Sequence, residues 1–111
     1  MHEGRETTMT VTKVVRYRTG SAQVADENQR LINEVFAELA TTRPEGLQYA
    51  AFRLEDGVSF VHVAVLDDGA ANPLAASSAF ARFQAGIEDR CVEGPAPADA
   101  TVVGHYRMLS G

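Results

Sequence analysis

Cysteine is nearly absent from this 111-residue chain, in which Cys91 is the single example. A lone cysteine cannot form a disulfide within the chain, and no Cys/His cluster has zinc-site spacing, so neither a disulfide framework nor a metal site is expected. Basic residues are also few, 10 Lys and Arg against 15 Asp and Glu, which gives a net charge of -5. They are scattered along the chain, and this argues against a nucleic-acid partner.

The sequence also lacks an apolar run of about 20 residues, the length needed to cross a bilayer. Its first residues mix His, Glu, Arg and Thr without the apolar stretch of a signal peptide, so the cytoplasm is the expected compartment. We expect residues 1–9 to form a disordered leader and residues 10–111 to form a single domain. Because the sequence shows no phosphate-binding glycine loop, metal triad or flavin fingerprint, any activity is expected to need no cofactor.

What the chain does have is the composition of a globular domain, with 45% apolar and 23% charged residues. The segment Val11–Arg18 is rich in β-branched and aromatic residues and stops at Gly20-Ser21, which predicts a strand followed by a turn. Apolar residues then recur at helical spacing from Val24 to Leu39. They predict a helix that ends near Thr42, where a proline and a glycine follow.

Two further strand-like runs, Leu47–Leu54 and Val58–Leu66, flank Glu55-Asp56-Gly57. An Asp-Gly pair in such a gap predicts a β-hairpin, and the apolar residues on both faces of the second run are typical of a central strand. Asn72-Pro73 predicts the start of a second helix, with a short first turn interrupted at Ser77-Ser78.

An apolar stripe from Phe80 to Cys91 should turn this second helix towards the sheet. Beyond it, Gly94–Pro97 is expected to be a stiff connector and Thr101–Leu109 a final strand.

The order β, α, β, β, α, β is that of an α+β, ferredoxin-like domain. Its four-stranded antiparallel sheet should have the strand order four, one, three, two, with both helices on one face. The other face would then expose Val14, Phe52 and Phe60. Burial of that face against a second copy would give a homodimer around a shared central cavity.

In this order of elements, three segments carry a resemblance: the first strand VVRYR, the hairpin PEGLQYAAFRLEDGVSFVHVAV and the helix start NPLAASSAFARF. They resemble the dimeric α/β-barrel superfamily, particularly its antibiotic-biosynthesis-monooxygenase-like (ABM-like) small proteins. The resemblance covers about Val11 to Leu109. It implies a dimeric α/β barrel with pockets between sheet and helices. The superfamily includes cofactor-independent oxygenases of phenols or quinols, heme-degrading enzymes and proteins of undefined activity.

The chain departs from those enzymes at two points. Leu66 replaces the tryptophan that often closes the third strand, and the chain has no tryptophan at all. The histidines common in the second helix are missing between Ala75 and Phe83, so heme degradation is disfavoured.

His62 is the first site candidate. Alternation along the third strand would place Phe60, His62, Ala64 and Leu66 on the cavity side and the valines between them on the helix-packed side. There His62 would act either as a general base or as a buried histidine hydrogen-bonded to a neighbour.

Arg16 is the second candidate, because on the neighbouring strand it would share the cavity face with Val14 while Val15 and Tyr17 face the helices. It could hold a phenolate, carboxylate or enolate, or form a salt bridge at the rim. On the hairpin's first strand, Gln48, Ala50 and Phe52 would share that face, with Leu47, Tyr49 and Ala51 towards the helices. Substrate-binding roles are therefore expected for Gln48, Phe52, Phe60 and Leu66, with a dimer hydrogen bond as the alternative for Gln48.

Other polar residues leave open alternatives. His105 and Tyr106 lie on opposite faces of the expected last strand, and either could turn into the cavity. Asn28 and Gln84 are expected to form caps or buried hydrogen bonds. Cys91 is expected to be a small core residue rather than a nucleophile.

Three functions are compatible with these features. The first is a cofactor-independent monooxygenase-like enzyme in which His62 acts on a small phenol or quinol held by Arg16 or Gln48. The second is a dimer that binds a small apolar ligand without transforming it. The third is a structural protein whose Phe52 and Phe60 only join the protomers.

Overall fold

The computed structural model describes residues 10–67 and 72–108, so the expected leader at residues 1–9 lies outside the described part. The chain begins with strand β1 (Thr10–Thr19), helix α1 (Ala22–Thr42) and the hairpin strands β2 (Leu47–Arg53) and β3 (Ser59–Asp67). A 3-10 turn η2 (Pro73–Ala76), helix α2 (Ser78–Ala85), the one-turn helix α3 (Ile87–Arg90) and strand β4 (Cys91–Ala100) follow.

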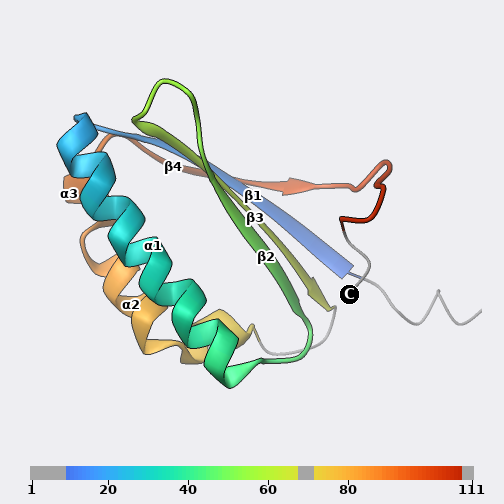
Figure 1. The fold of residues 1–111 in the computed structure, drawn as a ribbon. Helices are drawn as coiled ribbons and strands as arrows, with labels where there is room; N and C mark the ends of the chain where they lie inside the picture. The colour runs from blue at the N-terminus through green and yellow to red at the C-terminus, as the bar shows by residue number, and fades with distance from the viewer. Residues whose placement is uncertain (1–9, 68–71, 109–111) are drawn as a thin grey trace, which may run out of the picture.

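The four strands form one sheet in the order β2-β3-β1-β4, and each neighbouring pair is antiparallel. This is the strand order that the sequence predicts, and it confirms the ferredoxin-like fold. Figure 1 shows α1 and α2 lying together on one side of the sheet, while no helix covers the other side. We call the uncovered side the open face.

Local chemistry explains where the helices begin and end. The Ser21 hydroxyl accepts a hydrogen bond from the backbone N–H of Val24 and caps α1, which ends at Arg43 in a left-handed conformation with φ 48°. Asn72 caps η2, and Ser77 then caps α2 by accepting from the N–H of Phe80. The interruption expected at Ser77-Ser78 is thus the point where η2 gives way to α2.

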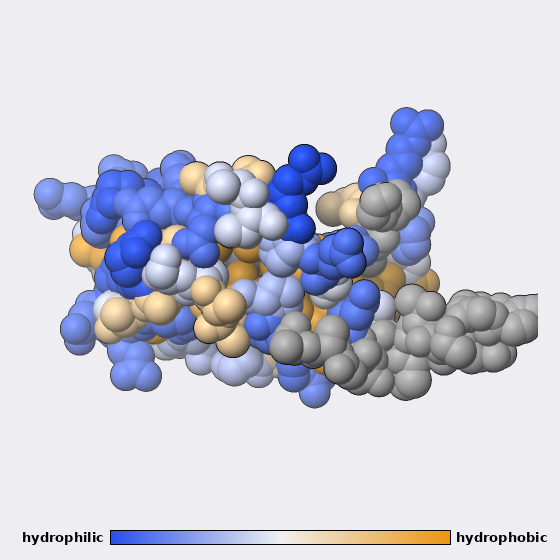
Figure 2. Space-filling view, turned by 90° about the horizontal axis from the view of Figure 1, so that it is seen from below, coloured by the Kyte–Doolittle hydropathy of each residue, from blue (hydrophilic) through white to orange (hydrophobic). Residues whose placement is uncertain are grey.

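The core lies between the sheet and the helices. Its members include Tyr17 and Phe60 from the sheet and Ile32, Val35 and Phe83 from the helices. The Tyr17 and Phe60 rings stack with centroids 5.4 Å apart. Figure 2 shows that the molecule seen from below is mostly hydrophilic, with the apolar residues visible mainly in hollows. No helix within the described ranges is long and apolar enough to span a membrane.

The expectation for the last strand is wrong. The segment that pairs with β1 is Cys91–Ala100, which includes the expected connector, and Cys91 is the first residue of β4 rather than the end of a helix. Residues 101–108 form neither helix nor strand and are exposed, so neither His105 nor Tyr106 faces a cavity. Residue 109 lies outside the described part.

The expected orientation of β3 is also wrong, because the register with β1 reverses it. Phe60 pairs with Tyr17 and His62 pairs with Val15, and residues directly opposite each other in a sheet share a face. Tyr17 and Phe60 belong to the core, so His62 points towards the helices as well. Val61, Val63 and Val65 are therefore the residues that occupy the open face.

Candidate functional site

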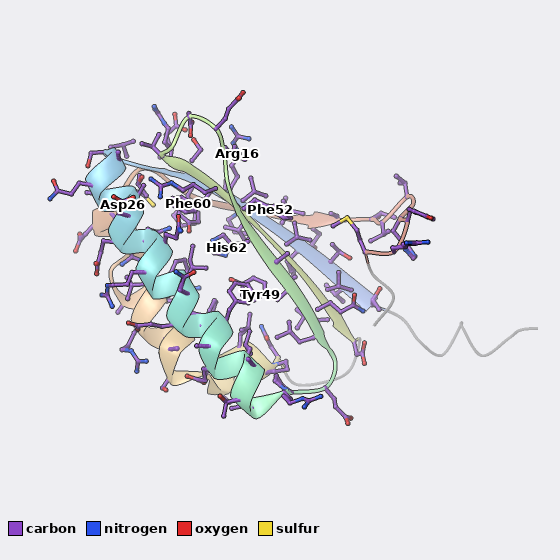
Figure 3. All side chains as sticks on the ribbon, in the orientation of Figure 1. Arg16, Asp26, Tyr49, Phe52, Phe60 and His62 are labelled. Atoms are coloured by element: carbon purple, nitrogen blue, oxygen red, sulfur yellow. The ribbon has the colours of Figure 1, made fainter. Side chains whose placement is uncertain are left out.

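A cavity of about 180 Å³ lies between the sheet and the second helical segment. Its walls are mostly apolar, and the polar side chains among its lining residues include Tyr49 and His62, which Figure 3 shows between the sheet and α1. A dry apolar cavity of about 150 Å³ accommodates a benzene ring, so this one has room for a single six-membered ring. The lining residues are Lys13, Val15, Tyr17, Tyr49, His62, Ala64, Leu66, Asn72, Leu74, Phe80, Phe83, Gln84, Ile87 and Pro95.

His62 is held between two tyrosines. Its Nε2 atom lies 2.7 Å from the hydroxyl of Tyr17, and its Nδ1 atom lies 2.7 Å from the hydroxyl of Tyr49. The imidazole ring stacks on Phe83 with centroids 5.4 Å apart, and the Tyr49 ring stacks on Phe36 at 4.9 Å. Aromatic packing and hydrogen bonding together fix the ring of His62, which is only 6% exposed.

The network continues from Tyr17 into the helices. The side-chain amide of Asn28, on α1, donates to the Tyr17 hydroxyl at 2.8 Å. The Nε atom of Arg90, on α3, donates to Asn28 Oδ1 at 2.9 Å, and its NH2 group donates to the carbonyl of Phe83 at 2.6 Å. Asn28 is fully buried, as the sequence predicts for a hydrogen-bonding residue on the apolar stripe.

Burial favours the neutral forms of His62, Tyr17 and Tyr49 near pH 7. Desolvation lowers the pKa of His62 to about 4, because a charged imidazole would lose its hydration in this setting. Desolvation also raises the pKa of the Tyr49 hydroxyl, and it raises that of Tyr17 against the opposing hydrogen bond from Asn28. His62 is thus a neutral imidazole between two neutral phenols.

The structure brings together only part of the predicted site. Leu66 lines the cavity with His62, but on the helix side of the sheet rather than at a dimer-facing cavity. Arg16 is exposed and, because its neighbour Val15 pairs with His62, it projects from the opposite face. Arg16 and His62 therefore cannot act on the same ligand within one protomer.

Three other expected substrate-binding residues lie outside this cavity. Gln48 and Phe52 are on the open face with Arg16, which agrees with the expected orientation of β2. Phe60 is 1% exposed and belongs to the core, so its expected exposure at a dimer interface is wrong. Phe52 and Phe60 line a separate groove between β2 and α1.

Sequence reasoning placed Tyr17 and Tyr49 on the helix side without giving either a role. A usable signal was available, since a buried tyrosine hydroxyl needs a hydrogen-bond partner. Asn28, on the apolar stripe of α1, is one such partner. The contribution of Arg90 has no comparable signal, because it depends on the one-turn helix α3.

Within residues 10–67 and 72–108, no group of three or more His, Cys, Asp or Glu side chains could hold a metal ion. The polar groups that line the cavity are the phenols of Tyr17 and Tyr49, the imidazole of His62, the amides of Asn72 and Gln84, and the ammonium group of Lys13.

Comparisons with known proteins place the fold. No protein-family model matches this chain, and no functionally curated protein matches it in sequence. Among solved structures, SnoaB, a cofactor-independent oxygenase from Streptomyces nogalater, is 21% identical with a TM-score of 0.64, and the match covers 88% of this chain and 97% of that one.

Two further structures are similar. An antibiotic biosynthesis monooxygenase is 19% identical with a TM-score of 0.67, and the match covers 86% of this chain and 100% of that one. A dimeric ferredoxin-like protein of unknown function from Jannaschia sp. CCS1 is 13% identical with a TM-score of 0.64, with coverage of 85% and 100%. The chain thus has the ferredoxin-like fold of ABM-like proteins, as the sequence resemblance implies.

Proposed function

We propose that this protein is a cofactor-independent monooxygenase-like enzyme that oxidises a small single-ring phenol or quinol in the cavity beside His62. The observation that carries the proposal is the cavity itself, whose volume of about 180 Å³ and apolar walls suit one aromatic ring. Among the polar side chains that line it, Tyr49 has a hydroxyl that can hydrogen-bond to a ring oxygen. The fold shared with a cofactor-independent oxygenase supports the choice of reaction.

The reaction needs no external reductant. In the simplest case a phenol and one dioxygen molecule give a para-quinone and one water molecule. One oxygen atom enters the ring at the carbon para to the hydroxyl, and the other leaves as water with the hydrogens that the ring and hydroxyl lose. The substrate supplies all the electrons, so the protein has to bind the ring, stabilise charge on its oxygen and exclude bulk water.

His62 is poorly suited to take a full proton from such a substrate. Phenols have a pKa of about 10, whereas burial lowers that of His62 to about 4. Proton transfer from phenol to imidazole would then be uphill by about 8 kcal/mol. Since both ring nitrogens also have tyrosine partners, we assign His62 the role of orienting Tyr49 instead of the general-base role considered from the sequence.

A second function, ligand binding without turnover, uses the same cavity. It is favoured by the hydrogen bonding of His62, whose two nitrogens are already engaged and so are not free to take part in chemistry. The two functions differ in oxygen consumption and share the ligand class.

Oxygen uptake by the purified protein would test the enzymatic proposal. A panel of monocyclic phenols and quinols is incubated with ¹⁸O-labelled dioxygen, and we expect at least one to give a quinone with a single labelled oxygen at a rate proportional to enzyme. Ala64→Leu fills the cavity at a lining residue and should reduce the rate at least about 10-fold. Ala37→Leu makes the same change on the exposed face of α1 and should leave the rate unchanged.

Binding of a phenol without labelled product would support the second function and reject the first. Equal rates for Ala64→Leu and Ala37→Leu would show that the chemistry occurs elsewhere.

We also infer that the open face joins two copies of the chain. It presents an apolar surface around Arg16, formed by Val14, Val61, Val63, Ala50 and Phe52, and Phe52 is 45% exposed. Contiguous apolar surface of this kind is typical of a protein contact. A similar structure is a dimeric ferredoxin-like protein, which supports a homodimer as the assembly.

A further inference from the structure

Arg90 fixes the direction of every hydrogen bond in the buried network. A guanidinium group can only donate, so the atom of Asn28 that faces Arg90 Nε must be the acceptor Oδ1. The amide nitrogen of Asn28 then faces Tyr17 and donates to its hydroxyl oxygen at 2.8 Å. The orientation of the Asn28 amide is thus set by chemistry rather than by choice between two similar atoms.

The same reasoning passes from Tyr17 to His62. The Tyr17 hydroxyl oxygen accepts from Asn28, whose amide nitrogen cannot accept in return. Within the described part of the chain, the remaining hydrogen-bond partner of this hydroxyl is Nε2 of His62 at 2.7 Å. Tyr17 therefore donates its proton to Nε2, and Nε2 carries no hydrogen.

A neutral imidazole has one N–H group, so in His62 it is on Nδ1. Nδ1–H donates to the hydroxyl oxygen of Tyr49 at 2.7 Å. The hydroxyl of Tyr49 has no other hydrogen-bond partner among residues 10–67 and 72–108, and Tyr49 lines the cavity. Its proton is available to a molecule bound there.

We propose that Tyr49 is the ligand-contacting donor of the cavity, and that the cavity selects a ring oxygen that accepts a hydrogen bond, such as a phenolate or a quinone carbonyl. A ligand hydroxyl that must donate would meet a tyrosine oxygen already occupied by Nδ1–H. Arg90, Asn28, Tyr17 and His62 are positioning residues that set this preference through the hydrogen bonds leading to Tyr49, and the polar atoms of Tyr17 and His62, which also line the cavity, are already paired within this network. This inference deepens the proposed function, but it requires only that the cavity binds a ring.

The probe for this proposal is 4-nitrophenol, whose ionised and neutral forms differ in visible absorbance. We expect the wild-type protein to bind the ionised form in preference to the neutral form. Tyr49→Phe keeps the ring on Phe36 and removes only the hydroxyl, so it should weaken binding of the anion about 10-fold, the equivalent of about 1.4 kcal/mol. Binding of toluene, which has a similar ring and no oxygen, should not change.

Asn28→Asp is the sharper variant, since it is isosteric and lies three hydrogen bonds away from Tyr49 on the path through Tyr17 and His62. A carboxylate at this position still accepts from Arg90 and now also accepts from Tyr17. The direction of the whole network should then reverse, with the histidine proton moving to Nε2 and Tyr49 donating to Nδ1. The variant should favour neutral 4-nitrophenol over the anion.

The tautomer of His62 gives a readout that needs no ligand. Nitrogen-15 NMR of the protein should show Nδ1 protonated in the wild type and Nε2 protonated in Asn28→Asp. The proposal is overturned by an Nε2–H tautomer in the wild type, or by equal binding of the anion to wild type and Tyr49→Phe. Should Asn28→Asp not fold, these two measurements still decide the question.

The outcomes also separate this proposal from the proposed function. Preferred binding of the anion through Tyr49 without any labelled product would reject the enzyme and support the role of Tyr49. Labelled product, together with unchanged binding of the anion to Tyr49→Phe, would support the enzyme and reject the role of Tyr49.

Discussion

At the scale of single residues, His62 shows how burial changes the work a side chain can do. A histidine on a solvated surface titrates near neutral pH and can exchange protons. His62 is enclosed by two tyrosines and Phe83, and desolvation lowers its pKa to about 4. The same enclosure that removes it as a base makes it a rigid connection between Tyr17 and Tyr49.

This shift predicts an acid-dependent loss of stability. Between the usual pKa of 6.5 and the folded-state value of about 4, the unfolded chain binds a proton at His62 and the folded chain does not. The free energy of unfolding therefore falls as the pH is lowered through this window, by about 3 kcal/mol at pH 4. Below that pH the folded protein also becomes protonated and the loss from this residue stops growing.

Urea unfolding of wild type and His62→Gln across this range would isolate the effect. Glutamine does not titrate, so the stability advantage of the wild type over the variant should shrink by about 3 kcal/mol between pH 7 and pH 4. Carboxylates titrate in both proteins and cancel in the difference. Parallel pH profiles would mean that His62 is not buried as a neutral residue.

The residues of β3 also explain why the predicted orientation of this strand is wrong. Phe60, Val61, Val63, Val65 and Leu66 place apolar side chains on both faces, so alternation alone cannot say which face is covered by helices. The predicted orientation of the two neighbouring strands is correct, because the apolar side chains Val15 and Tyr17 of β1 and Leu47, Tyr49 and Ala51 of β2 do face the helices. The cross-strand register, which pairs Val15 with His62, is what shows which face of β3 the helices cover.

At the scale of elements, β4 was missed because of its prolines. Pro95 and Pro97 lack a backbone N–H, and proline within an apparent strand normally argues against that assignment. β4 lies at the edge of the sheet and pairs only with β1, so one side of its backbone needs no partner in the protomer. Thr101–Leu109, which the sequence predicts to be the strand, is exposed beyond the sheet over its described residues 101–108.

The other elements were predictable because their signals are local. Asp56 illustrates this, since its carboxylate accepts hydrogen bonds from the backbone N–H groups of Val58 and Ser59 and closes the hairpin turn. The helix boundaries follow in the same way from Ser21 and from Asn72-Pro73. What local signals could not supply is the one-turn helix α3, whose Arg90 reaches back to Asn28.

The cap of α1 gives a prediction at this scale. The hydroxyl of Ser21 accepts from the N–H of Val24 at 3.2 Å, and Ser21 is exposed. Ser21→Ala should cost about 1 kcal/mol of stability. In a domain of this size that corresponds to a fall of about 4–8 °C in the melting temperature.

Ser21→Asp is the matched control, because a carboxylate also accepts from the helix N-terminus and favours its dipole. It should melt within about 2 °C of the wild type. If both variants melted alike, the hydroxyl hydrogen bond would not be what stabilises this end of α1.

At the scale of the whole molecule, the two faces of the sheet have different roles. The helix-covered face holds the cavity, the hydrogen-bonded network and the core residue Phe60. The open face holds Arg16 and the apolar residues around it, which we propose to bury between two protomers. In this arrangement each protomer contains a complete network, so assembly and ligand recognition can be altered separately by mutation.

The last prediction tests that separation through Phe52, which is 45% exposed on the open face. Phe52→Glu places a charge in the proposed interface, where burial without a partner would be costly. Light scattering should then show a monomer at concentrations where the wild type is a dimer, while the melting profile of each protomer stays cooperative. Ala37→Glu adds the same charge on the exposed face of α1 and should remain dimeric. Phe60→Glu differs from both, because it places a charge in the core at a residue that is 1% exposed, and it should unfold the protein instead of dissociating it. A dimer that persists in Phe52→Glu would place the contact between protomers on another surface.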